Sequence, residues 1–540
     1  MDSPAPSTKS RRALFTLVVL IFAAGHLPFL GSGWTNLECW TAKAASRAGA
    51  GDPAGAVTLL HDIIASPPFY ALALGPVTAA FGDSPFVVRM PALLLALLTL
   101  WVVWRGGGRL FGAGEALLAA AFLAFNPLFW TYSCASATFD LPFTCASACL
   151  AFAVLGACES DRPGAHFAAG LWLGVCLLIK YNAVAWLPAV FLCLMTAAPV
   201  ADGTPLLVNL KTALRRGLWY LPGIIAAFVV LYALSTYTGE LLSERADSSR
   251  VSRLPEYLIL APLRLSAYLI WIGALSGGFV LAGWFSRARE GARAVARSIP
   301  GWLPILNAAL IAGVEWARAS RPGFLGELDL GWIAHLASAP ALWLLEFLLL
   351  CMGETVLAHL FRWIASGRGS AARAALWVIA GLAVHTLNRG AARYLMAFLP
   401  LLAVLLAAHY TPLLAGARRA GERLIVAASL AGGLALGLFS TAYFAVEGDA
   451  AEALVRQVNA EPLRDIRFEV SNSVLAHCGC SLDESLHAPP GPPARWVFVT
   501  YAPGDDTSRA RFVTSVEMLG KLWKRYGIEP VSGIPGESPP

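Results

Sequence analysis

The chain has 540 residues, of which 57% are hydrophobic and only 14% are charged, and its mean hydropathy is +0.63. A soluble globular protein carries about 25% charged residues, so this composition excludes an ordinary soluble domain. Apolar runs of about 18 residues or more recur along the chain, and each can cross a hydrocarbon layer of ~30 Å as a helix. The runs do not show the alternating ~10-residue segments of a membrane β-barrel. The sequence therefore predicts an all-α polytopic membrane protein.

The apolar runs predict about thirteen membrane spans. The first, Ala13–Leu30, follows Lys9, Arg11 and Arg12 and has no clear signal-peptide cleavage site. A polar first outer loop, 32–85, comes next, with a short interfacial helix over Pro67–Phe81. The remaining spans are Phe86–Trp104, Glu115–Tyr132, Leu141–Ala157, Phe167–Ile179, Ala183–Ala197, Leu218–Ser235, Tyr257–Phe285, Trp302–Val314, His335–Leu357, Ala375–Leu387, Tyr394–His409 and Leu424–Phe444.

The loop charges predict the orientation of these spans. Alternate loops carry clusters of Lys and Arg, for example Arg105-Gly-Gly-Gly-Arg109 and Lys211/Arg215/Arg216. The positive-inside rule assigns these loops to the cytoplasm. The opposite loops also hold some basic residues but contain most of the acids. With an odd number of spans, the N-terminus is then cytoplasmic and the C-terminal tail is extracytoplasmic.

The tail differs in composition from the rest of the chain, so we expect two domains, a transmembrane domain over 1–444 and a small α+β domain over 445–540. A strand is predicted over Arg495–Tyr501 and a helix over Arg509–Tyr526. Cys478 and Cys480 are one residue apart, which fits either a strained disulfide or two unrelated thiols.

Two carboxylates stand at predicted span ends on the outer side. Glu38 follows the first span, and Asp140 directly precedes Leu141-Pro142 at the start of the fourth. A carboxylate at a membrane surface either faces water or has a function, and a base at this depth can deprotonate an acceptor while a lipid tail stays in the bilayer. The alternatives are a solvated loop acid for Glu38 and a helix N-cap for Asp140.

Other polar residues on the same side are candidates for substrate binding. His61-Asp62 fits a substrate-orienting pair, a cation site or a plain interfacial dipeptide. Lys180 interrupts an apolar stretch and suits a phosphate, or simply snorkels at a helix end. Arg389 and Arg393 are four residues apart, and on one helix face they would repel each other unless an anion lies between them. An ordinary charged loop is the alternative for these arginines.

Two further acids, Glu346 and Glu354, lie inside a predicted span. Acids within a bilayer are typical of transport pathways. They also fit a polar cavity or the cytoplasmic interface. This pair is the main sequence feature that favours a transporter.

Several blocks resemble a known family by their order and spacing. Ser66-Pro-Pro-Phe-Tyr70 is similar to a K/H-P-P-L-Y-Y block, and the stretch from Asp83 through Arg89 to Pro91 is similar to S-V-R-L-P-S-A. Further blocks are Asn126-Pro-Leu-Phe with Ala137–Asp140, Gly174–Lys180 and Arg393–Pro400. Together they resemble GT-C glycosyltransferases of the protein O-mannosyltransferase and aminoarabinose (lipid A) transferase type, mainly over 15–200 and 385–410.

The resemblance implies a GT-C-like fold, a polyprenyl-phosphate sugar donor, and catalysis on the extracytoplasmic face of a bacterial inner membrane. It also implies an acid in the first outer loop. From the residues and the resemblance together, we take Glu38 and Asp140 as catalytic candidates, and His61, Asp62, Tyr70, Lys180, Arg389 and Arg393 as substrate-binding candidates. Family members usually carry Asp-Glu in the first outer loop, where this chain has Leu37-Glu38. Ser66 stands where Lys or His is common. The Arg that usually precedes the second acid is absent from Tyr132–Phe139.

The sequence thus favours a membrane glycosyltransferase acting on a protein, lipid A or another envelope glycan. Its partners would be the lipid-linked donor, the acceptor and membrane lipids, with no nucleic acid. Some family members use a divalent cation such as Mg²⁺ or Mn²⁺, so a cation is possible, although no metal shell is evident. The alternatives are a flippase or transporter of a lipid-linked saccharide, and a non-catalytic GT-C-like assembly subunit.

Overall fold

The fold is that of a computed structural model, which describes seventeen stretches of the chain. These are residues 7–34, 38–64, 68–134, 139–160, 162–196, 206–238, 254–290, 303–320, 338–367, 369–387, 392–414, 419–461, 466–467, 496–501, 505–508, 510–518 and 521–530.

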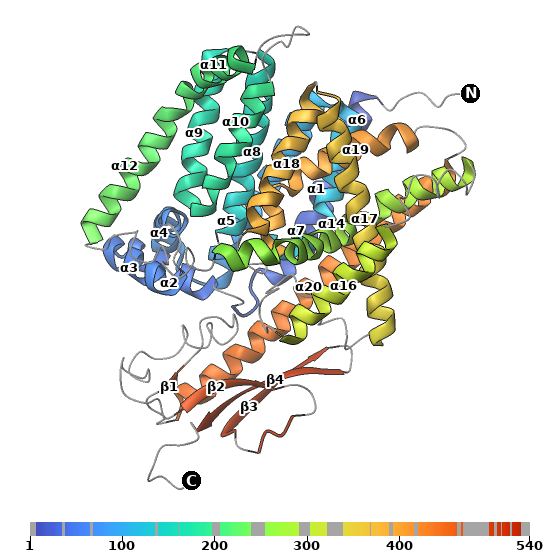
Figure 1. Cartoon of the computed structure of the whole chain (residues 1–540). Helices are drawn as coiled ribbons and strands as arrows, with labels where there is room; N and C mark the ends of the chain where they lie inside the picture. The colour runs from blue at the N-terminus through green and yellow to red at the C-terminus, as the bar shows by residue number, and fades with distance from the viewer. Residues whose placement is uncertain are drawn as a thin grey trace.

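Helices form the body of the molecule (Figure 1). Those of the first half are α1 (Thr8–His26), α2 (Glu38–Gly49), α3 (Pro53–Ile64), α4 (Phe69–Phe81), α5 (Pro85–Leu110), α6 (Ala113–Ala124), α7 (Pro127–Cys134), α8 (Asp140–Ser160), α9 (Pro163–Ile179) and α10 (Trp186–Thr196). Those of the second half are α11 (Leu206–Gly217), α12 (Leu221–Thr238), α14 (Leu254–Glu290), α16 (Leu303–Ser320), α17 (Ala339–Ala365), α18 (Gly369–Thr386), α19 (Leu399–Leu414) and α20 (Ala420–Asn459). Short 3₁₀ helices are η1 (Leu27–Phe29), η2 (Tyr181–Ala185), η3 (Leu218–Tyr220) and η6 (Ala392–Ala397).

Seven of the described helices are long and apolar enough to cross a membrane, and the bent pair of α6 and α7 gives an eighth span if it counts as one. The shorter apolar helices cover Phe69–Phe81, Pro163–Ile179, Tyr181–Thr196, Ile305–Ala317 and Leu399–Leu414. The all-α membrane class is therefore confirmed, while the number of thirteen spans stays a prediction.

The span expected over Glu115–Tyr132 is wrong as a single straight helix, because α6 and α7 meet at an angle of 63°. Asn126 causes the break. Its side-chain oxygen accepts hydrogen bonds from the amides of Leu128 (3.1 Å) and Phe129 (3.3 Å), and Pro127 opens α7. A capping Asn followed by Pro ends one helix and starts another. The bend sets the path along which the chain approaches Asp140.

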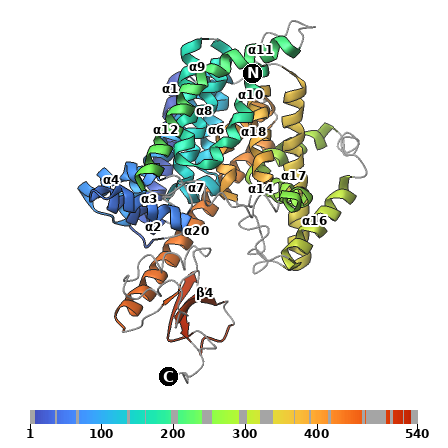
Figure 2. The same ribbon diagram turned by 60° about the vertical axis from the view of Figure 1, so that its left-hand side comes forward.

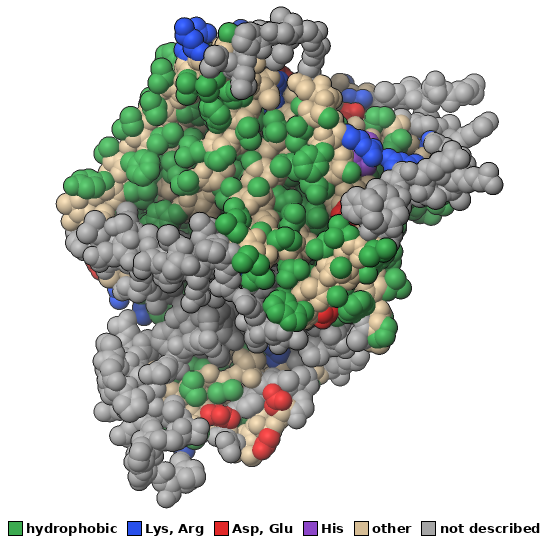
Figure 3. All heavy atoms as spheres, viewed as in Figure 1, with side chains coloured by type: hydrophobic (Ala, Val, Ile, Leu, Met, Phe, Trp, Pro, Cys, Tyr) green, Lys and Arg blue, Asp and Glu red, His purple; other side chains and the backbone are tan. Residues whose placement is uncertain are grey.

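The helical body exposes large apolar side chains over a broad surface, seen as the green face in Figure 3. Leu17 of α1, Phe228 of α12 and Leu344 of α17 are more than half exposed. A face of this kind is stable against hydrocarbon and costly in water. In contrast, α8 is buried around most of its circumference, so it lies inside the bundle.

Helices α14 and α17 pack at backbone distance. A Cβ built on Gly273 would lie 1.9 Å from the carbonyl oxygen of Leu349, and one on Gly353 would lie 2.0 Å from that of Leu269. Only glycine fits at both positions. Small residues at crossings are the usual means of packing helices in lipid, where the hydrophobic effect does not drive their association.

The C-terminal part forms a four-stranded sheet in the order β1-β2-β4-β3. Its strands are β1 (Ile466–Arg467), β2 (Trp496–Tyr501), β3 (Phe512–Met518) and β4 (Lys521–Pro530). Strand β1 pairs with β2 in parallel, and the other pairs are antiparallel. The strand expected over Arg495–Tyr501 is confirmed. The helix expected over Arg509–Tyr526 is wrong, because strands β3 and β4 cover this region and Val516 of β3, with Tyr526 and Ile528 of β4, fills the inner face of a sheet.

The sheet packs on the end of α20, where Ala451, Leu454 and Val458 contact the inner face. Helix α20 therefore continues through residue 444, where the sequence suggests a boundary between two domains, and joins the helical body to the sheet (Figures 1 and 2). In both views the sheet lies at one end of the helical body and the N-terminus at the other.

Ile528→Ala is expected to detach the sheet from α20. Ile528 is fully buried, and truncation of such a side chain costs about 2–5 kcal/mol. Limited proteolysis of the purified full chain should show faster cleavage of the tail. Val513→Ala, on the opposite face of β3, is the control and should change stability by less than about 0.5 kcal/mol. Equal cleavage of both variants would contradict the packing described for the sheet.

Candidate active site

Glu38 forms a buried ion pair with Arg89 of α5. Arg89 Nη2 lies 2.7 Å from Glu38 Oε2 and Nε lies 3.2 Å from Oε1, so the guanidinium binds both carboxylate oxygens. The side chains are 1% and 0% exposed. Glu38 opens α2, where the positive end of the helix dipole also favours a carboxylate.

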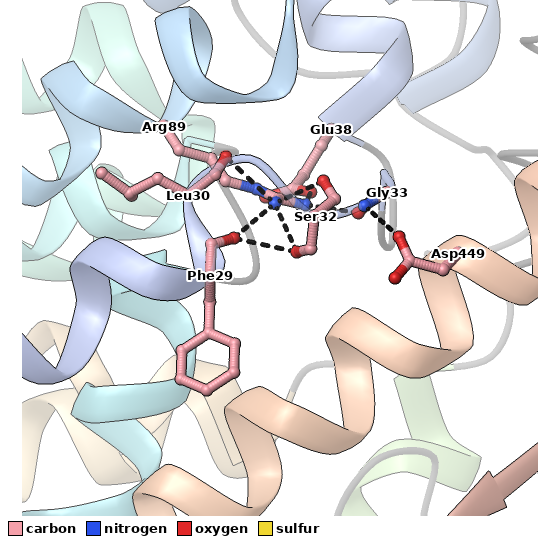
Figure 4. Close-up of polar contacts among 7 residues, drawn as sticks. All are labelled: Phe29, Leu30, Ser32, Gly33, Glu38, Arg89 and Asp449. Carbon is pink, nitrogen blue, oxygen red and sulfur yellow. Dashed lines mark hydrogen bonds and ion pairs between the residues drawn. The ribbon is translucent and has the colours of Figure 1, made fainter.

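Arg89 also holds the chain that leads from α1 to α2. Its Nη1 donates to the carbonyls of Phe29 (3.0 Å) and Ser32 (2.9 Å), and its Nη2 donates to that of Gly33 (2.8 Å). Figure 4 shows these contacts converging on one guanidinium group. The five N–H donors of an arginine, fixed in one plane, suit such a junction better than a lysine ammonium does.

The same loop is tied to α20. Asp449 accepts a hydrogen bond from the Gly33 amide at 2.7 Å (Figure 4). A Cβ on Gly33 would lie 2.5 Å from the backbone of Gly448, so the two segments cross at backbone distance. Since α20 also carries the sheet, Gly33 links the sheet-bearing helix to Arg89 and hence to Glu38.

Tyr70 of α4 lies near this ion pair. Its phenol is buried, and the hydroxyl has no hydrogen-bond partner among the described residues. Burial, with the negative charge of Glu38 as the smaller cause, raises the pKa of the phenol. Tyr70 is therefore a neutral donor close to Glu38.

A second cluster combines Asp140, Lys180 and Arg393. Lys180 Nζ forms an ion pair with Asp140 Oδ1, and Arg393 Nε lies 3.8 Å from Asp140 Oδ2. Asp140 is 2% exposed, Lys180 8% and Arg393 20%. Three separate segments meet here, namely the first residue of α8, the break between α9 and η2, and η6. With one acid and two bases, these three side chains carry a formal net charge of +1.

Aromatic rings enclose Lys180. Its Nζ lies 4.7 Å from the ring centre of Tyr394 and 4.9 Å from that of Phe139, both within cation–π range. Tyr394 in turn stacks on His385, with ring centres 5.1 Å apart. The ammonium is thus held by a carboxylate and by ring faces, with little contact with solvent.

The path of the chain places both clusters at the same end of the helical body. Helix α5 leads away from Arg89, and α6 and α7 together return to Asp140 at the start of α8. The ion pair of Glu38 with Arg89 is also joined to α20 near the sheet, so this is the end of the body that faces the sheet (Figure 1).

Some predicted site residues cannot be placed. His61 and Asp62 belong to α3, but their side chains lie outside the described part of the chain, and so does Arg389 altogether. The described residues contain no group of three or more His, Cys, Asp and Glu that could hold a metal ion. The cluster around Asp140 offers one carboxylate beside two cations, which does not fit the oxygen shell of Mg²⁺ or Mn²⁺.

The sequence interpretation gave no role to Arg89, Tyr394 or Asp449. Arg89 could have been found, because it is a lone charge within the apolar run Phe86–Trp104, and such charges are usually paired or functional. Asp449 carries no comparable signal, since its partner is a backbone amide 416 positions away in the chain. Cys39, next to Glu38, is disulfide-bonded.

Comparison with known proteins shows what the chain resembles. Residues 65–232, which include Tyr70, Arg89, Asp140 and Lys180, match the family model described as dolichyl-phosphate-mannose-protein mannosyltransferase. No curated protein sequence matches the chain.

Solved structures show the same relationship at the level of the fold. ArnT from Cupriavidus metallidurans bound to undecaprenyl phosphate is 14% identical with a TM-score of 0.51, and the match covers 98% of this chain and 100% of that one. Apo ArnT from the same organism is 13% identical, with a TM-score of 0.49 and coverages of 96% and 97%. An oligosaccharyltransferase, AglB from Archaeoglobus fulgidus with an inhibitory peptide and a dolichol-phosphate, is 13% identical, with a TM-score of 0.43 and coverages of 84% and 58%. The conclusion about the fold depends on the match to undecaprenyl-phosphate-bound ArnT alone. With the family model, it confirms the resemblance to the GT-C glycosyltransferases expected from the sequence.

Arg89→Gln is expected to destabilise the whole protein. The change leaves the Glu38 carboxylate buried without its cation, and breaking a buried ion pair costs about 3–5 kcal/mol. Thermal unfolding in detergent measures the loss. The double variant with Glu38→Gln should cost less than the sum of the single variants, because both remove the same interaction. Additive costs would contradict the coupling described for the two side chains.

Asp449→Ala is expected to loosen the loop that carries Gly33. The loss of one hydrogen bond costs about 0.5–1.5 kcal/mol, and local opening should raise hydrogen exchange at the Gly33 amide. Asp449→Asn keeps an acceptor oxygen and should preserve the protection. Gln457→Ala, at an exposed position of the same helix, is the control. Unchanged exchange in Asp449→Ala would rule out the tether.

Proposed function

We propose that this chain is an integral-membrane glycosyltransferase that moves a sugar from a polyprenyl-phosphate donor to an acceptor on the extracytoplasmic face. The observation that carries the proposal is the cluster of Asp140 with Lys180 and Arg393. Two cations placed side by side can together bind a phosphate, the lysine as a point charge and the arginine through a bidentate contact. A lipid-linked phosphate suits the position, because its tail can remain in the bilayer while its charge meets the cations.

Lys180 and Arg393 would stabilise the phosphate as it leaves. During transfer the bond between the sugar's anomeric carbon and the phosphate oxygen breaks, and negative charge builds up on that oxygen. Cations fixed in a site from which water is largely excluded lower the energy of such a charge. The partial exposure of Arg393 leaves its guanidinium accessible for a bidentate contact with phosphate.

Asp140 would act as the general base. The proton of the acceptor hydroxyl or amine passes to Asp140 as the acceptor atom bonds to the anomeric carbon, in a direct inverting displacement. In the structure Asp140 is bound by Lys180. A donor phosphate competing for the ammonium would release the carboxylate for the acceptor, so donor binding would precede activation of the base.

Glu38 is the second acid of the proposal, with a positioning role. Its carboxylate is buried and accepts two hydrogen bonds from Arg89, so both of its oxygens are already engaged. The geometry therefore favours a role in fixing the first outer loop and Tyr70 beside the site. The sequence-based hypothesis that Glu38 itself removes the proton requires the ion pair with Arg89 to open.

Two features support the extracytoplasmic face. The basic loops obey the positive-inside pattern with the N-terminus in the cytoplasm, and the N-terminus and the sheet lie at opposite ends of the helical body. Cys39 beside Glu38 is disulfide-bonded, and disulfides persist in oxidising compartments. A bacterial inner membrane with the site on its outer side accommodates both.

Transport of a lipid-linked saccharide is the second candidate. Helix α17 contains Glu346, which is 1% exposed, and Glu354, which accepts a hydrogen bond from Asn307 at 2.8 Å. Polar contacts of this kind between apolar helices occur in transport pathways. They lie on α16 and α17, away from the cluster around Asp140.

Asp140→Asn is expected to reduce sugar transfer by about 10²–10⁴-fold, the usual contribution of a general base. It should also lower thermal stability, because the buried Lys180 loses its charged partner, so transfer is measured at a temperature where the variant remains folded. Glu38→Gln should lower thermal stability and leave a larger share of the activity. Purified protein with radiolabelled polyprenyl-phosphate sugars measures transfer, and Glu346→Gln is the control that should retain it.

Each rival predicts a different result in the same assay. Passage of intact donor across liposomes without transfer would favour the transporter. The absence of both activities, with co-purifying partners, would favour a non-catalytic subunit. Full transfer by Asp140→Asn would refute the proposed base.

A further inference from the structure

A cavity of about 680 Å³ opens at the N-terminal end of α1, among the ends of α1, α5 and α8. It has no part in the proposed transfer reaction. Four arginines line it, Arg11 and Arg12 from α1 and Arg105 and Arg109 from α5. The N-terminal end of α1 adds partial positive charge from its backbone amides.

Among the residues that the structure describes, no acid is paired with these four arginines. In the part of the chain that the structure describes, none of them forms an ion pair, and the Arg11 Nε atom is buried without a hydrogen-bond partner. Arg105 and Arg109 are four residues apart on one helix, so like charges face the same side. A pocket surrounded by four unpaired guanidinium groups is stabilised by a bound anion.

Apolar side chains form another part of the cavity lining. Trp104 and Phe152 line it, and Trp104 stacks on Phe15 of α1 with ring centres 4.2 Å apart. A Cβ on Gly106 would lie 2.6 Å from the Phe152 ring, so the glycine run lets α5 pack closely against that ring. A cavity lining that combines guanidinium groups with aromatic rings suits an amphiphilic ligand, which has a charged head group and apolar chains.

The cavity is lined by the N-terminal end of α1 and the C-terminal end of α5, and the sheet lies at the other end of the helical body from the N-terminus (Figures 1 and 2). The positive-inside rule assigns its loops to the cytoplasmic side. Anionic lipids give the cytoplasmic leaflet a negative surface, and basic pockets between membrane helices on that side bind phosphate-bearing head groups.

We propose that the cavity formed by α1, α5 and α8 binds the phosphate head group of an anionic phospholipid through Arg11, Arg12, Arg105 and Arg109, with the acyl region against Trp104 and Phe152. Each basic residue close to an anionic lipid contributes about a fivefold increase in affinity for that lipid. The assignment is independent of the transfer reaction at the opposite end.

The test is lipid retention by the delipidated full-length protein, measured by native mass spectrometry with phosphatidylglycerol, phosphatidylcholine or inorganic phosphate at fixed ionic strength. Wild type should retain phosphatidylglycerol selectively. Arg105→Gln with Arg109→Gln should raise its Kd by about 30-fold. Lys211→Gln with Arg215→Gln removes the same charge from α11, outside the cavity, and should leave the Kd unchanged.

A charge-neutral variant tests the cavity itself. Gly156 lines it, and a Cβ added there meets no atom within 4 Å. Gly156→Leu should therefore fill the space and weaken phosphatidylglycerol binding with no change of charge. Unchanged affinity in this variant or in the Arg105/Arg109 variant would overturn the proposal. Equal weakening in the α11 control, equal retention of phosphatidylcholine, or equal binding of inorganic phosphate would also overturn it.

Discussion

The buried contact between Arg89 and Glu38 organises the end of the molecule where the candidate site lies. A guanidinium inside a membrane protein is costly unless its donors are satisfied, and here the donors reach a carboxylate and four backbone carbonyls. The contact thereby joins α5, the end of the first span and α2. Through Gly33 it also reaches Asp449 on α20, so the sheet and the first outer loop share one anchor.

The sequence suggests the same role for Glu38 and Asp140, but the structure places the two acids in different surroundings. Glu38 is held by a bidentate arginine, whose other hydrogen bonds fix it to backbone carbonyls. Asp140 is held by a lysine and lies near a partly exposed arginine, both of which a phosphate can recruit. The difference between the two sites is the difference between a rigid ion pair and an exchangeable one. A site for group transfer needs an ion pair that stays in place and holds the backbone, and also a cation that can exchange its carboxylate partner for a phosphate.

The two ends of the helical body differ in their charges. At the end near the sheet, cations pair with buried acids, while at the other end the described residues that line the cavity include four arginines and no acid. In a bilayer these ends meet different surfaces. The arginines around the cavity suit contact with the anionic head groups of a lipid leaflet. Charges that are already paired within the protein suit a site that must select one particular phosphate ligand over other anions. The apolar belt between the ends, seen in Figure 3, faces hydrocarbon in this arrangement.

The sequence by itself determined the membrane class, most helix positions and the two acids as candidates, because apolar length and isolated charges are local properties of the chain. The blocks around Arg89, Asp140 and Lys180 also indicated the fold family. Only the tertiary structure decided which cation binds which acid, since Glu38 and Arg89 are 51 positions apart and Asp140 and Lys180 are 40 apart. It also decided that β3 and β4 are strands, where the sequence suggests a helix, because their apolar side chains pack against α20. Pairing across such separations depends on how helices cross in three dimensions, and no local pattern encodes it.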